Sequence, residues 1–234
     1  WGELAKEIPD STLKFQQQRL QDAMQQTQAV SPVELRQAME QSEVHSFGWP
    51  IGLVMTRPEY APKPYRDGIR ATILTTGLTD RHSFDHWALR TDGVFYLLKT
   101  LFEDERSEGK IFVDTRIVRT AETLLRLSRL YRTLHVTPEE QMVVRLRYAG
   151  LRSRVLSFAD SARVMRHDRV CVENETETWI KERLKDIEPK LTDLVHAAVS
   201  ELCILFDYFP LSKEQVVQPL VEKFLRENPE RSTA

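Results

Sequence analysis

Cysteine is scarce in this sequence, and its scarcity excludes a disulfide-stapled fold. Only two cysteines, Cys171 and Cys203, occur among 234 residues. Both lie in apolar runs, where a free cysteine behaves as a small buried hydrophobic residue. We therefore expect both thiols to be reduced and buried, and the protein to reside in a reducing cytoplasm.

Long apolar runs are missing as well. The richest run, residues 202–206, ends at Asp207, far short of the roughly 20 residues that cross a bilayer. No signal peptide or lipidation motif is visible, so we expect no membrane partner. The chain begins with Trp1 rather than Met, which favours a piece of a longer protein whose effector or DNA-binding domain lies elsewhere.

Glycine is sparse, and its 8 residues form no phosphate-binding loop. The sequence has no Walker motif, no Rossmann glycine fingerprint, no Cys-x-x-Cys pair and no Gly-x-Ser-x-Gly elbow. These absences exclude the common nucleotide hydrolases and redox enzymes, and we expect no cofactor. A hydrophobic share of 41% excludes a disordered chain.

Charge is nearly balanced overall but unevenly distributed. The net charge is −2, yet residues 105–170 carry an excess of six positive charges, almost all from arginine. Arginine suits bidentate contacts with phosphate or carboxylate groups. Ion pairing with the acidic remainder of the chain is the alternative to ligand binding.

Periodicity and capping signals predict an α+β fold. The expected helices cover residues 10–42 in two pieces, the second starting at a Ser31 capping box, then 114–134, 181–209 and a last one from Ser212. The expected strands cover residues 47–55, 68–74, 84–91, 94–102, 142–148, 152–158 and 169–172. This order favours an antiparallel sheet of about six or seven strands covered by long helices. The expected divisions are an N-terminal helical extension at 1–43, an α+β sensing or assembly domain at 44–209, and a C-terminal helix and tail at 210–234.

The clearest local signal is a hairpin. Asp92-Gly93 stands between two apolar runs, which is typical of a two-residue type I′ turn. We therefore expect the strands on either side of it to pair.

The densest polar cluster is the segment 80–87. In a strand, His82, Phe84 and His86 share one face, because side chains alternate. Two histidines with the nearby Asp85 could bind a metal or transfer protons. Solvated or hydrogen-bonded side chains leading into a strand are the alternative.

Aromatic residues and arginines gather in the first half of the predicted sheet. Aromatic rings combined with arginine stack nucleobases, whereas core packing is the ordinary role of aromatics in strands. The candidate stacking residues are Trp49, Tyr65, Trp87 and Tyr96.

A second candidate surface is an arginine face. Arg145 and Arg147 are two residues apart on one predicted strand, and Arg152 and Arg154 follow a turn at Ala149-Gly150. Four arginines on paired strands could bind phosphates, or they could pair with the glutamates of residues 173–177. The arginines of the predicted helix 114–134 lie opposite its apolar side, as on a solvent-exposed helix face.

Three segments together resemble a known family region. They are Phe47-Gly48-Trp49-Pro50-Ile51-Gly52, Trp87-Ala88-Leu89-Arg90-Thr91-Asp92-Gly93-Val94-Phe95-Tyr96 and Phe112-Val113-Asp114-Thr115-Arg116-Ile117-Val118. Residues 44–209 resemble the region that follows the Schlafen/AlbA-type domain, to which DNA binding is attributed, in large bacterial regulatory and antiviral defence proteins. The AlbA-type signature itself is absent. The resemblance implies a cytoplasmic sensing or assembly module and carries over no functional residue.

These observations favour a non-enzymatic accessory module of a larger bacterial protein. Such a module binds a ligand or partner, with nucleotide or nucleic acid as the candidates for the arginine face, and a homo-oligomer is a further possibility. The alternative is a metal-assisted hydrolase that uses His82, Asp85 and His86.

Overall fold

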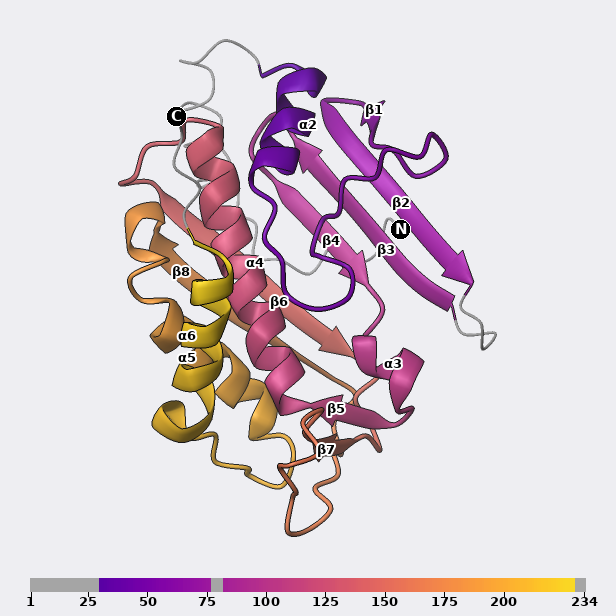
Figure 1. Cartoon of the computed structure of the whole chain (residues 1–234), viewed down its shortest axis with the longest axis vertical. Helices are drawn as coiled ribbons and strands as arrows, with labels where there is room; N and C mark the ends of the chain where they lie inside the picture. Colours follow the sequence, from indigo (N-terminus) through magenta and orange to yellow (C-terminus); the bar gives the residue numbers. More distant parts are fainter. Residues whose placement is uncertain (1–29, 77–81, 230–234) are drawn as a thin grey trace.

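The computed structural model describes residues 30–76 and 82–229 (Figure 1). The helix expected near Ser11 and the turn expected at Gly77 lie outside this part. The fold is mixed helix and strand, which confirms the α+β class.

Four strands form the largest sheet: β1 (Lys63–Tyr65), β2 (Gly68–Thr76), β3 (His82–Arg90) and β4 (Phe95–Lys99). They are antiparallel and neighbour one another in chain order. Burial alternates along β2, β3 and β4, because successive side chains of a strand point to opposite faces. One face is therefore part of the core, and the other is open.

The β3–β4 connection differs from the two-residue turn expected at Asp92-Gly93. The backbone N–H of Arg90 donates to the Val94 carbonyl at 3.0 Å, which leaves a three-residue loop. Gly93 has φ of 81°, whereas Asp92 is not in the positive-φ region. A type I′ turn needs positive φ at both central residues, so that expectation was wrong; one left-handed glycine closing a three-residue loop fits instead.

The remaining strands do not extend this sheet. β5 (Lys110–Phe112) pairs in parallel with β7 (Val155–Ser157), and β6 (Gln141–Ala149) pairs antiparallel with β8 (Glu175–Arg183). The prediction of a single antiparallel sheet of about six or seven strands was therefore wrong, because the described strands form sheets of four, two and two strands. The parallel pair is possible because a helix and a strand separate β5 from β7 along the chain.

Two segments that were expected to be strands are largely irregular. Residues 47–55 form no strand, and Gly48 and Gly52 in this segment both have positive φ, near 60°. Residues 169–172 contribute only an isolated bridge from Val170 to Val155. Conversely, residues 175–183, of which 181–183 were expected to begin a helix, form β8.

Two helices, α2 (Pro32–Gln41) and α4 (Val113–Thr133), begin and end close to their sequence signals, whereas the helix expected over residues 181–209 covers only Leu191–Cys203. The Ser31 capping box is present at α2: the Ser31 hydroxyl accepts from the Glu34 N–H, and the Glu34 carboxylate accepts from the Ser31 N–H at 2.6 Å. The other helices are α3 (Phe102–Arg106), a 3₁₀ turn (Leu184–Asp186), α5 (Leu191–Cys203), a π turn (Lys213–Val217) and α6 (Gln218–Glu227).

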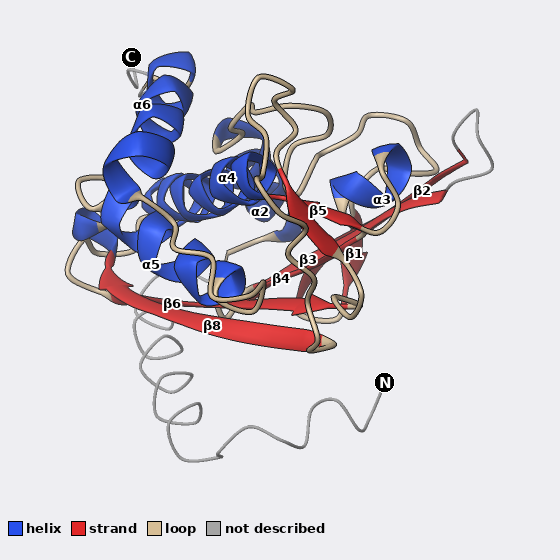
Figure 2. Ribbon diagram, turned by 90° about the horizontal axis from the view of Figure 1, so that it is seen from below, coloured by secondary structure: helices blue, strands red, loops and turns tan. Residues whose placement is uncertain are grey.

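Helix α4 organises the core. It contacts α2, α5 and α6, while α2 also packs on β2 and α5 packs on β8. Figure 2 shows α4, α5 and α6 on one side of β6 and β8, with no described helix on the opposite side. Cys171 and Cys203 are both free and buried, as expected. No helix in the described part is both long and apolar enough to span a membrane.

Candidate functional site

The open face of the four-stranded sheet is the surface that best fits a binding role. Along β2, β3 and β4, every second side chain points away from the core, and several of these are large and apolar. Tyr96 is 46% exposed and Leu98 is 44% exposed, although both lie on strand β4 within the sheet. We call this surface the open face; its described side chains are those of Lys63, Tyr65, Arg70, Thr72, Leu74, Phe84, His86, Ala88, Arg90, Tyr96 and Leu98.

Strand register brings the rings of the open face together. His86 lies opposite both Thr72 and Leu98. Its ring lies 6.4 Å from the Phe84 ring and nearly parallel to it, at 16°. The Tyr96 ring is 6.3 Å from His86, edge on. Three rings from two adjacent strands therefore form a continuous aromatic strip.

A cation lies beside a fourth ring of this face. The Arg70 guanidinium is 3.9 Å from the centroid of the Tyr65 ring, which is within cation–π distance. A hollow of about 410 Å³ lies beside Tyr65 and Arg90, and Gly68 and Ala88 are among the residues that line it. The open face thus combines exposed rings, a cation and a depression.

The electrostatics of the open face are one-sided. None of its described side chains is acidic. Two carboxylates at its rim, Asp67 and Asp92, both pair with Arg90, at 2.9 and 2.7 Å. Lys63 and Arg70 make no ion pair within residues 30–76 and 82–229. The open face therefore presents positive charge to an anionic ligand.

The surroundings of His86 favour the neutral form of its ring. Partial burial lowers the pKa of His86 below its usual value, and the positive charge of Arg70 lowers it further, against an opposing effect from Asp85. Nδ1 of His86 shares a hydrogen bond of 2.8 Å with the Thr72 hydroxyl. A neutral ring fixed in this way is suited to stacking.

The four predicted stacking residues do not come together. Tyr65 and Tyr96 lie on the open face, but Trp87 is fully buried on the other face, where its Nε1–H donates to the Leu53 carbonyl at 3.0 Å. Trp49 is half-buried in the irregular segment 43–62, and its carbonyl accepts from Arg119.

Sequence reasoning missed Arg70, and it assigned no stacking role to Phe84 or His86. The signal that could have found them is the alternation along β3. Because Trp87 is flanked by His86 and Ala88, a buried Trp87 requires His86 to point to the solvent side.

The predicted metal cluster is not assembled. Asp85 projects to the buried face and pairs with the Lys99 ammonium at 2.8 Å, whereas His86 points to the open face. The idea that Asp85 and His86 act on one ligand was therefore wrong, because adjacent side chains of a strand point to opposite faces of the sheet. No group of three metal-ligating side chains occurs in the described residues.

The predicted four-arginine face is not formed either. β6 pairs with β8, not with the segment that carries Arg152 and Arg154. Arg145 pairs with Glu177, and Arg147 pairs with Glu175.

Arg154 lies in another part of the fold, where its guanidinium pairs with Asp104 at 2.6 Å.

The ion pairs between β6 and β8 also affect the glutamates. The hydrogen bond from Arg145 lowers the pKa of the Glu177 carboxyl below its usual value. Internal pairing, the alternative left open by the sequence, is what the β6–β8 arginines do.

Three arginines of α4 are buried rather than solvent-exposed (Arg116, Arg119 and Arg126), while Arg129 and Arg132 are half-buried. Arg119 pairs with Glu122 at 2.6 Å, and its guanidinium also donates to the carbonyls of Phe47 and Trp49. Arg126 donates to the carbonyls of Met39 and Gly52, and burial lowers its pKa to about 10. The expectation of an exposed arginine face was wrong because the segment after α2 covers this side of α4.

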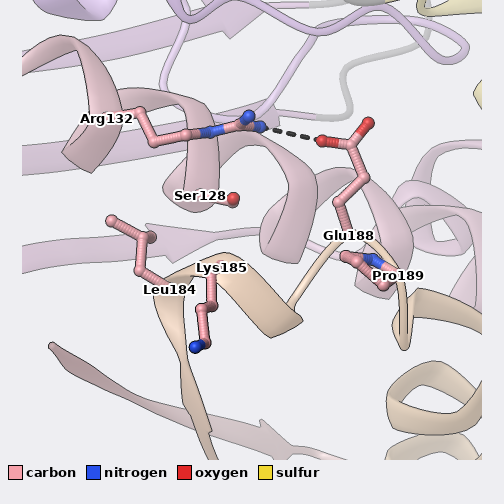
Figure 3. A pocket seen from close by; sticks show the side chains of 6 residues that line it. All are labelled: Ser128, Arg132, Leu184, Lys185, Glu188 and Pro189. Atoms are coloured by element: carbon pink, nitrogen blue, oxygen red, sulfur yellow. Dashed lines mark hydrogen bonds and ion pairs between the residues drawn. The ribbon is translucent and has the colours of Figure 1, made fainter. Parts of the chain in front are cut away.

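A second hollow, of about 350 Å³, lies between α4 and the chain that precedes α5 (Figure 3). An ion pair of 2.8 Å between Arg132 and Glu188 crosses one side of it. Lys185 points away from that pair and binds Glu139 instead, at 2.8 Å. The charged side chains that line this hollow are already in ion pairs, with one another or with Glu139. The open face therefore fits a charged ligand better.

Comparison with known proteins adds no relative. No family model, no curated protein and no solved structure matches the chain. The functional argument therefore rests on the geometry of the open face.

Proposed function

We propose that this protein is a non-enzymatic binding module that takes single-stranded nucleic acid on the open face of β1–β4. The observation that carries the proposal is the strip of Phe84, His86 and Tyr96. It is flanked by Lys63 and Arg70, which make no ion pair with any residue that the structure describes. Every nucleobase has a flat π-face that stacks on such rings, while cations along the strip attract the phosphates.

Single strands fit this surface better than duplexes. The bases of a duplex are stacked inside it and cannot reach rings on a flat sheet, whereas an unpaired strand can place its bases on them. The arrangement of the strip across two antiparallel strands would allow two or three bases to stack in succession. Lys63 and Arg70 would then lie near the phosphates of the bound strand.

The proposed role within a larger protein follows the same logic. A module that binds nucleic acid without catalytic residues would act by reporting the ligand to another domain of a longer cytoplasmic protein. This agrees with the expected accessory module and with the resemblance of residues 44–209 noted above. A metal-assisted hydrolase has no comparable support, since Asp85 and His86 point to opposite faces.

The experiment is an affinity measurement with fluorescently labelled single-stranded oligonucleotides, read by anisotropy. Tyr96→Ala should weaken binding about 5- to 150-fold, because stacking of one base is worth about 1–3 kcal/mol. Arg70→Ala should weaken binding for all sequences and reduce the slope of log affinity against log salt by about 0.7.

The matched control is the double variant Arg145→Ala/Arg147→Ala. It removes two arginines whose charges are already paired with Glu177 and Glu175, so it should leave affinity and salt slope unchanged. Loss of binding in this control but not in Tyr96→Ala would contradict the proposal. So would wild-type protein that shows no salt-dependent binding.

A further inference from the structure

Strand β8 has an edge that no strand covers in the part of the chain that the structure describes. The sheet that it forms with β6 has only two strands. Within residues 30–76 and 82–229, β8 pairs with no other strand. It is nine residues long, contains neither proline nor glycine, and pairs with β6 in unbroken register. Natural proteins blunt such edges with short strands, prolines, bulges or charged side chains, because exposed N–H and C=O groups recruit another strand. Of these devices β8 has only the charged side chains, which carry both signs.

The sequence of β8 is complementary to itself when it runs antiparallel. If two copies are centred on Trp179, Glu175 of one copy lies opposite Arg183 of the other, and Glu177 lies opposite Lys181. All five positions have the same parity, so these side chains share the exposed face. Opposite charges directly across paired strands stabilise the pairing, and so do paired aromatic rings.

Glu175 and Glu177 already pair within the chain with Arg147 and Arg145, and Arg183 pairs with Glu139. A carboxylate has two oxygens and can accept from a second cation, so these pairs leave room for the contacts between copies.

Trp179 is 41% exposed although it lies at the middle of the strand. Its Nε1–H donates to Glu177, and the Arg145 guanidinium lies 5.4 Å from its ring, which keeps the indole over the sheet. Lys181 is exposed and makes no ion pair within the described part of the chain.

The edge of β6 lacks this property. Two copies of β6 centred in the same way would place Arg145 opposite Arg145, and like charges directly opposite destabilise a sheet. Self-pairing is therefore favoured at the edge of β8 and disfavoured at the edge of β6.

We propose that β8 is the interface of a two-fold symmetric dimer, in which the β6–β8 pairs of two copies join into one four-stranded antiparallel sheet. The occupant of the edge is a second copy of this chain, because the charges along β8 are opposite in sign to those of a second β8 that runs antiparallel to it. The Glu175–Arg183 and Glu177–Lys181 contacts each occur twice and the Trp179–Trp179 contact occurs once, on the axis, as two-fold symmetry requires. This proposal stands independently of nucleic-acid binding.

Disulfide trapping tests the register. Cβ atoms of directly opposed residues in an antiparallel pair are about 4.5–5.5 Å apart, so Trp179→Cys should form a covalent dimer under mild oxidation. Lys181→Cys is the matched control: its two thiols would lie four residues apart along the strands, about 13 Å, and should not cross-link. A mixture of Glu177→Cys and Lys181→Cys proteins should give the mixed dimer. Cys171 and Cys203 are buried and should not interfere.

Charge reversal tests the same interface without thiols. Lys181→Glu would place two carboxylates opposite each other twice in the dimer, and should raise the dimer dissociation constant in sedimentation velocity by about tenfold or more. Adding Glu177→Lys restores opposite charges and should restore the dimer. A wild-type protein that remains monomeric at its highest soluble concentration would overturn the proposal. Equal cross-linking of Trp179→Cys and Lys181→Cys, or an unchanged dissociation constant for Lys181→Glu, would do the same.

Discussion

Arg119→Ala should be among the most destabilising single substitutions in this protein. The guanidinium pairs at 2.6 Å with Glu122, whose side chain is 0% exposed. Glu122 in turn accepts from the backbone N–H of Ile51 and from the Ser46 hydroxyl, both at 2.7 Å. Removal of Arg119 leaves a buried carboxylate without its counter-charge and frees the carbonyls of the segment after α2.

The magnitude follows from burial. Breaking a buried ion pair by removing one partner costs about 3–5 kcal/mol, against a total stability of about 5–15 kcal/mol for a domain. At roughly 2–4 °C per kcal/mol for a chain of this size, the melting temperature should fall by about 6–20 °C. The control is Arg145→Ala, which breaks an exposed pair with Glu177 and should cost no more than about 1 kcal/mol.

Denaturant unfolding of both variants, alongside wild type, measures the difference. The double variant Arg119→Met/Glu122→Gln should lose less stability than Arg119→Ala, because it removes both charges together. Equal losses for Arg119→Ala and Arg145→Ala would refute the reasoning. They would mean that the α4 arginines are solvated, as the sequence pattern alone had suggested.

Three further predictions concern the backbone, the thiols and the open face. Gly68→Ala would place a Cβ 2.2 Å from a carbonyl oxygen of the facing strand, so it should cost at least about 1–3 kcal/mol in denaturant unfolding. Gly109→Ala, with φ of +77° but nothing within 4 Å, should cost only the left-handed strain of about 1–2 kcal/mol. Burial raises the pKa of the Cys203 thiol to about 12 and also raises that of Cys171, so both should react with a thiol reagent only as fast as the protein unfolds. His86, whose pKa is lowered in the folded state, should titrate below 6.5 by NMR, and because the unfolded chain takes up this proton first, its contribution to stability should decline as pH falls below 6.5.

The local features that sequence reasoning captured are those written in a few adjacent residues. The Ser31 capping box begins α2 as expected, α4 matches its expected span within one residue, and the β3–β4 hairpin forms. Each depends on capping, periodicity or turn chemistry, which act within a few residues of the chain.

The features that it missed depend on contacts far apart in sequence. An arginine opposite the apolar side of a helix has the same local pattern whether water or another segment covers it, and Arg119 and Arg126 are covered by residues about 70–90 positions earlier. β8 was missed in part because only one of its two buried positions, Ile180, is apolar, and the other is Thr178. The pairing of β5 with β7 is non-local in the same sense.

The candidate site was predicted in part. Tyr65 and Tyr96 reach the open face. The strand of Tyr96 was expected, whereas β1, which carries Tyr65, is not among the strands that the sequence predicted. Trp87 was assigned to the same surface as its neighbours by proximity in sequence, but adjacent residues in a strand face opposite sides. The prediction of a four-arginine face was wrong because the spacing of residues along the chain does not show which strands pair: β6 pairs with β8, not with the segment of Arg152 and Arg154.

The most direct test of the open face as a binding surface is photo-crosslinking of a bound single-stranded oligonucleotide, with the adducts mapped by mass spectrometry. The proposed arrangement predicts adducts on the peptides that carry Phe84 and Tyr96, weakened by salt and lost in Tyr96→Ala. Adducts confined to β6 and β8, or no adduct above that of an unrelated protein, would contradict it.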